Sequence, residues 1–123
     1  MASVLLFRDD KGPIDGGWLL GFLQSLAGVS DIRVDEVHGA RIHCSYTEGE
    51  DSVLVELLAS SLALVISDLG PAACDLAVRL QACSNVPLRI IDEGYSFDLL
   101  LGEFNTAAEL DAGIEAAFLE GDE

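Results

Sequence analysis

Hydrophobic residues fall into short runs and helical stripes that predict ten elements along this chain. Apolar or alternating runs of about four to eight residues are typical of strands. Stripes with apolar residues three or four positions apart are typical of helices. We expect strands at residues 3–7, 32–37, 41–46, 53–58, 62–67, 88–91 and 97–101. We expect helices at residues 14–27, at 71–83 and from 107 to just before Gly121.

Local signals mark the limits of these helices. Trp18, Phe22 and Leu26 recur at every fourth position and define the stripe of the first helix, which Gly28 stops. The second helix has Pro71 at its first position, where proline costs no hydrogen bond. The segment 106–109 begins with Thr and ends with Glu, the pattern of a capping box at a helix start.

The order of these elements, β-α-β-β-β-β-α-β-β-α, predicts an α+β fold. We expect one domain over residues 1–123, with a largely antiparallel sheet and three helices on one face or divided between both faces. The run at 3–7 is apolar throughout, so we expect this strand to be buried on both faces. The run at 62–66 is also apolar on both faces, which predicts a central place in the sheet.

Charge then excludes two classes of partner. The chain holds 22 Asp and Glu against 6 Lys and Arg, a net charge of -16. Nucleic acids and anionic membranes attract positive charge, so we expect neither as a partner. Half of the residues are hydrophobic, which excludes a disordered chain. We find neither an apolar run of about 20 residues, the length that crosses a bilayer, nor a signal peptide, so we expect a soluble cytoplasmic protein.

The cysteines do not predict a disulfide framework. Cys44, Cys74 and Cys83 are odd in number and form no CxxC pair, which favours reduced, buried thiols. Cys74 and Cys83 lie nine residues apart in one predicted helix, on opposite faces, so they cannot pair there.

We find no motif that predicts catalysis, a cofactor or a metal site. His43 and Cys44 are neighbours in a predicted strand, which sends their side chains to opposite faces, so with His38 they do not form a ligand set. A Gly-x-Ser-x-Gly nucleophile motif is lacking. The segment 15–18 does not match a glycine-rich phosphate loop, and its Asp15 stands where a phosphate would bind. We therefore expect a protein that is not an enzyme and binds no cofactor.

Acidic residues gather at predicted loops and strand ends, where a partner can reach them. Spread evenly, the carboxylates would lie about 17 Å apart, beyond the screening length of about 8 Å, so clusters matter more than the total. Tyr95 stands beside two acids in a short turn, as a binding anchor with an electrostatic rim would; packing over the sheet edge is the other interpretation. The acids of the last helix fit a solvated face. The candidate partner-binding residues are Asp35, Glu36, Glu48, Glu50, Asp51, Asp92, Glu93, Tyr95 and Asp98.

The segment 88–97, LRIIDEGYSF, and the amphipathic helix that closes the chain carry a family resemblance. In overall plan from residue 3 to 118, the chain resembles the immunity proteins of bacterial polymorphic toxin and contact-dependent or type VI effector systems. The resemblance implies a cognate basic toxin whose active site the acidic loops occlude. Opposite charge would speed the encounter and select against wrong partners.

Two other binding roles stay open, and we also expect the chain to associate with itself. From residue 14 onward the order of elements is similar to that of class I type III secretion chaperones, which bind an effector, although the first strand and one hairpin strand are extra. A DNA-mimic inhibitor would also be acidic, but with carboxylates at regular spacing along an elongated face. Because half of the chain is hydrophobic, we also expect a partly bare sheet face and a weak homodimer when no cognate partner is present.

Overall fold

A computed structural model describes residues 3–35, 41–58, 60–92, 94 and 97–121. The described residues form seven strands, three α-helices and one short 3-10 helix. The strands are β1 (Val4–Arg8), β2 (Val29–Asp35), β3 (Arg41–Glu48), β4 (Asp51–Leu57), β5 (Leu64–Ile66), β6 (Leu88–Asp92) and β7 (Asp98–Leu100). The helices are α1 (Gly16–Ser25), α2 (Pro71–Cys83), the 3-10 helix η1 (Leu101–Glu103) and α3 (Ala107–Gly121).

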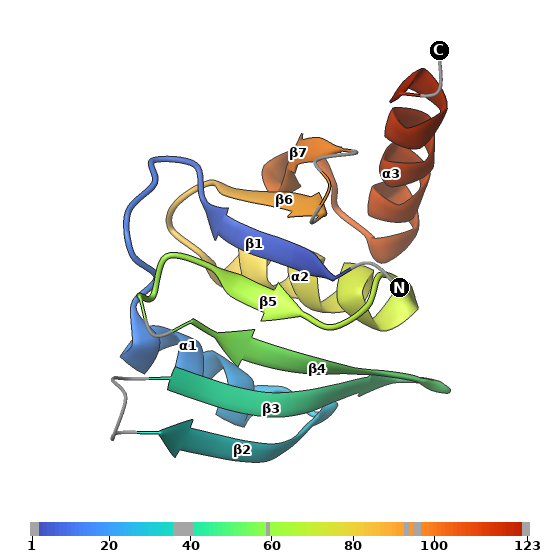
Figure 1. The fold of residues 1–123 in the computed structure, drawn as a ribbon. Coiled ribbons are helices and arrows are strands. Elements are labelled where there is room, and N and C mark those ends of the chain that lie inside the picture. The colour runs from blue at the N-terminus through green and yellow to red at the C-terminus, as the bar shows by residue number, and fades with distance from the viewer. Residues whose placement is uncertain (1–2, 36–40, 59, 93, 95–96, 122–123) are drawn as a thin grey trace.

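All seven strands join one antiparallel sheet in the order β2-β3-β4-β5-β1-β6-β7 (Figure 1). β5 is the fourth of the seven, which confirms the central place predicted for the apolar run at 62–66. β1 enters the sheet between β5 and β6, so Leu5 pairs with Val65 on one side and with Ile91 on the other. The predicted α+β class and the predicted order of elements are confirmed.

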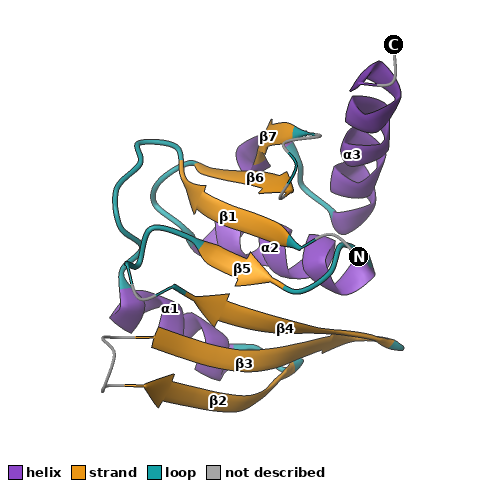
Figure 2. Ribbon diagram, in the orientation of Figure 1, coloured by secondary structure: helices purple, strands orange, loops and turns teal. Residues whose placement is uncertain are grey.

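The helices cover one face of this sheet. α1 and α2 lie behind it in Figure 2, and α3 packs against α2. The core lies between the sheet and the helices. Its largest fully buried side chains include Leu6, Leu57, Leu64 and Ile66 from the strands, and Leu19, Leu23, Leu76, Leu80, Leu110 and Ile114 from the helices.

Side chains cap two of the helices, and the sequence predicts the second of these caps. The Asp15 carboxylate accepts hydrogen bonds from the backbone N–H groups of Gly17 and Trp18, which fixes the start of α1. At α3, the N–H of Glu109 donates to the Thr106 hydroxyl, 3.1 Å away. The Glu109 carboxylate reaches back to the N–H of Asn105, one residue earlier than a standard capping box would have it.

Two sequence-based predictions about burial are wrong. In β1, Val4 and Leu6 are fully buried, but Leu5 and Phe7 are only half-buried, because the helices cover a single face of the sheet. Cys44 and Cys74 are buried as predicted, whereas Cys83 is exposed at the end of α2. Cys83 is the last residue of α2, beyond the buried part of the helix, which ends at Leu80.

Candidate interaction surfaces

The tip of the β3–β4 hairpin presents two exposed carboxylates. Glu48 pairs with Asp51 at the end of the ladder, and Gly49 takes the left-handed conformation, with φ of +62°, that the tight turn requires. Glu48 and Glu50 point into solvent. Asp51 does not: its carboxylate accepts a hydrogen bond of 2.9 Å from the N–H of Ala72, in the first turn of α2. The third acid of this predicted cluster is therefore a helix cap that holds the hairpin tip against α2.

A buried tyrosine connects this hairpin to the middle of α2. Tyr46 of β3 is 2% exposed, and its hydroxyl donates to the carboxylate of Asp75. The Arg79 guanidinium, one turn further along α2, donates to the same carboxylate at 2.8 Å. Burial raises the pKa of Tyr46 to about 12, and the hydrogen bond to Asp75 and the charge of Glu48 act in the same direction. Sequence analysis missed this network, although the spacing of four residues between Asp75 and Arg79 is the signal of an ion pair on a helix.

Carboxylates of β3 and of α3 each lie near α2 on the helix side of the molecule. Asp111 of α3 lies near enough to α2 for its charge to add to the effect of burial, which raises the pKa of Cys74 to about 11. Glu115 is exposed one turn further along the same face of α3. We call this region the acidic surface; its members are Glu48, Glu50, Asp75, Asp111 and Glu115.

Two acids of the predicted cluster around Tyr95 are described, and one of them does not lie at the surface. Asp92 is 4% exposed, so its side chain lies inside the fold and not on the rim of a binding surface. Asp98 is exposed and pairs with Arg89 at 2.8 Å, and Arg89 also pairs with Asp9 at 2.5 Å. Glu93, Tyr95 and Glu36 lie outside the described residues, as does the side chain of Asp35, the last residue of β2.

The face of the sheet opposite the helices is covered by no described helix, and we call it the open face. The register of the strands shows which side chains lie on it. One row of paired positions crosses the sheet on this face: Arg33, His43, Glu56, Val65, Leu5, Ile91 and Asp98. Of these residues, Ile91 is buried, at 5% exposed. Leu54 lies beside this row and is 65% exposed, the highest fraction among the large hydrophobic side chains that the structure describes. Two adjoining hollows, of about 650 and 280 Å³, share His43 and Leu54 in their lining.

The described thiols and imidazole do not form a reactive centre. Burial raises the pKa of Cys44 and of Cys74 to about 11, so both thiols stay protonated, and are poor nucleophiles, near neutral pH. His43 lies on the open face, 4.0 Å from the Glu56 carboxylate, while the neighbouring Cys44 is buried on the other side of β3. Within the described part of the chain, no three His, Cys, Asp or Glu side chains converge as metal ligands. His38 lies outside that part.

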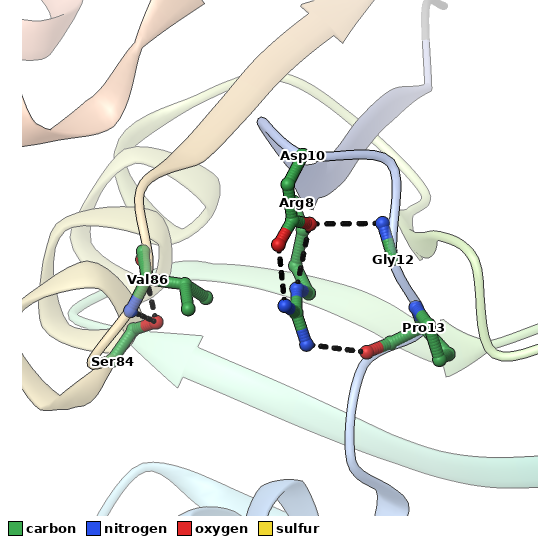
Figure 3. Close-up of polar contacts among 6 residues, drawn as sticks. All are labelled: Arg8, Asp10, Gly12, Pro13, Ser84 and Val86. Atoms are coloured by element: carbon green, nitrogen blue, oxygen red, sulfur yellow. Dashed lines mark hydrogen bonds and ion pairs between the residues drawn. The ribbon is translucent and has the colours of Figure 1, made fainter.

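A small cleft of about 230 Å³ beside the β1–α1 loop is built from groups that hold the loop in place (Figure 3). The Arg8 guanidinium makes two hydrogen bonds to the Asp10 carboxylate and one of 3.0 Å to the carbonyl of Pro13. The same carboxylate accepts a hydrogen bond from the N–H of Gly12. Asp15, also in the lining, caps α1. We therefore assign these polar groups to closing the loop.

Comparisons of this chain with protein-family models, with curated proteins and with solved structures find no match. Among the helices formed by the described residues, none combines the length and the hydropathy that crossing a membrane requires.

Proposed function

We propose that this protein is a non-catalytic binding protein that neutralises a cognate basic protein, most concretely an immunity protein that occludes the active site of a bacterial toxin. The observation that carries the proposal is the acidic surface, whose carboxylates on β3 and on α3 lie near the neighbouring α2 residues Asp75 and Cys74. Arg79, the one basic residue of α2, is paired with Asp75 and so leaves the surface strongly negative.

Electrostatics explains why such a surface suits an inhibitor that must act quickly. A negative patch raises the local concentration of a positively charged partner and orients it, which speeds association at low ionic strength. Positive charge is common around the active sites of proteins that cleave or bind nucleic acids. A rigid surface built on a sheet and two helices would cover such a site with little loss of conformational freedom.

The first experiment is to purify the protein from its native source, identify the protein that co-purifies with it, and measure whether it inhibits that partner's activity. An acidic partner would contradict the proposal. If the partner is a protein destined for export and its activity is unchanged, the chain would be identified as a secretion chaperone instead. Inhibition of a nuclease that DNA relieves by competition would identify a DNA mimic.

A second experiment tests the surface itself. Asp111→Asn combined with Glu115→Gln removes two charges from the acidic surface. Asp9→Asn combined with Asp31→Asn removes two charges elsewhere and leaves the same net charge. We expect the first pair to lower the association rate constant about threefold to tenfold at low salt, and the second pair to change it little. Equal effects of the two pairs would show that only total charge matters and would exclude this site.

A further inference from the structure

The open face carries almost none of the chain's negative charge. Among the described residues, its cations are Arg33, Arg89 and Lys11, whose ammonium group lies 4.8 Å from the centre of the Phe7 ring. Its carboxylates are those of Asp31, Glu56, Asp98 and Asp9, the last two paired with Arg89. Three cations against four carboxylates leave -1 on this face, whereas the whole chain carries -16. Contact between two copies through this face would therefore bring few uncompensated like charges together.

The order of residues along this row is suited to a second copy whose row runs across the sheet in the opposite direction. The row that crosses the sheet begins with the cation Arg33 on the edge strand β2 and ends with the anion Asp98 on the edge strand β7. Its centre is apolar, with Val65 on the middle strand β5 and Leu5 beside it on β1. A two-fold axis in the interface, along β5, would place Arg33 above Asp98 of the second copy and Val65 above its own counterpart, with Leu5 above the Glu56 side chain.

We propose that a second copy of this chain docks on the open face, giving a face-to-face dimer of two sheets with β5 at its centre. Sheets pack in this way about 10 Å apart, with their inner side chains interdigitated. Leu54, which stands out from the face beside the row, would be buried by the contact. A strongly basic partner is better matched by the acidic surface on the helix side. This assembly does not depend on the proposed function, because it requires no other protein.

The size of the face sets the strength of the association. Seven strands spaced about 4.8 Å apart span about 29 Å, and about five residues of each strand span about 17 Å, which gives a plan area of about 500 Å². A stable interface of standard size buries about 800 Å² on each partner. The open face falls short of this area, so we expect a reversible dimer with micromolar affinity that separates on dilution.

The test is sedimentation equilibrium of the purified chain from about 5 to 500 µM, at 50 and 300 mM salt, with a reducing agent so that exposed Cys83 forms no disulfide. We expect a monomer–dimer equilibrium that shifts toward the dimer in the higher salt, because salt screens the repulsion between two chains of charge -16. A monomer at all of these concentrations and both salt levels would overturn the proposal.

Two matched leucine variants locate the interface. Leu54→Lys places a charge on the open face, and we expect it to weaken dimerisation about tenfold or more. Leu62 is 51% exposed in the turn between β4 and β5 and belongs to no strand of the sheet, so Leu62→Lys should leave dimerisation unchanged. Both side chains are exposed, so both variants should keep the melting temperature of the parent at low concentration. A dimer that both variants retain, or lose equally, would lie on another surface and would refute the proposed one.

A charge variant tests the orientation of the two copies. Arg33→Glu should weaken the dimer, because it places two carboxylates together at each edge, whereas Arg33→Lys should retain it. Equal dimerisation of the two Arg33 variants would exclude the arrangement with the axis along β5.

Discussion

At the residue scale, three buried side chains make the stability of this fold sensitive to alkali. Tyr46, Cys44 and Cys74 each lie in the core, and burial raises the pKa of the tyrosine to about 12 and of both thiols to about 11. In the unfolded chain they ionise near their ordinary values of 10.0 and 9.0. Above pH 9 the unfolded state therefore holds fewer protons than the folded state, and rising pH favours unfolding.

We therefore expect full stability below pH 9 and a progressive fall in the melting temperature between about pH 9 and 12. Thermal unfolding followed by circular dichroism across this range would measure the effect. Tyr46→Phe lowers stability at pH 8, because it removes the hydrogen bond to Asp75. Between pH 10 and 12 its melting temperature should fall less steeply than that of the parent. A parallel fall for parent and variant would show that Tyr46 does not contribute to the alkaline transition.

The exposure of the three cysteines predicts their reactivity one by one. At pH 8, a chromogenic disulfide reagent should modify one thiol per folded chain quickly, because Cys83 is exposed while Cys44 and Cys74 are buried. All three thiols should react after unfolding in guanidinium chloride. Cys83→Ser should abolish the fast phase, and fast labelling that persists in this variant would mean that a buried thiol becomes accessible in the native state.

At the scale of single elements, α2 begins with a cap supplied by another part of the chain. Its own N-cap residue, Gly70, has no side chain to accept a hydrogen bond, and Asp51 of β4 fills this role at the N–H of Ala72. A Cβ atom at Gly70 would lie 3.0 Å from the Asp51 carboxylate, so glycine permits the close approach. The same contact holds the β3–β4 hairpin against the helix, which couples two elements that are distant in the sequence.

We expect Asp51→Ala to lower the free energy of unfolding by about 1–2 kcal/mol, because the N–H of Ala72 loses its partner and the hairpin loses its anchor. Urea denaturation would measure the loss. Asp51→Asn should retain most of the stability, since its amide oxygen can still accept the bond. Glu50→Ala, at the exposed neighbouring position, should behave as the parent does. A loss as large at Glu50 as at Asp51 would contradict the assignment of the cap.

At the scale of the whole molecule, net charge opposes folding. The four described Arg–Asp ion pairs involve only Arg8, Arg79 and Arg89, each at least partly exposed, and such pairs stabilise a fold little. Repulsion among the remaining carboxylates acts over the whole surface and is screened by salt. At higher salt, the stability gained by screening this repulsion should exceed the stability lost from the few ion pairs.

The melting temperature should therefore rise by a few degrees between 20 and 300 mM sodium chloride at neutral pH. Measurement at about 5 µM protein keeps the contribution of self-association small. An equal osmolality of a neutral solute serves as the control for effects that do not depend on charge. A melting temperature that falls as salt increases would show that the ion pairs outweigh the repulsion.

The sequence by itself determined the elements and their order, because these depend on interactions between near neighbours. Apolar periodicity separated strands from helices, and the capping box that begins at Thr106 marked one helix start that the structure confirms. The run at 62–66 is apolar on both faces, and this pattern was enough to predict its central place in the sheet.

Tertiary structure alone decided which residues meet, because contacts between distant segments leave no local pattern. β1 pairs with β5 and β6, more than 50 residues away, and this order places Arg33 and Asp98 at opposite ends of one row. Proximity in the sequence grouped Asp51 with Glu50, and Asp92 with Glu93, as surface acids. Folding instead made Asp51 a helix cap and buried Asp92, because strand pairing and helix packing, and not spacing along the chain, fix the exposure of each side chain.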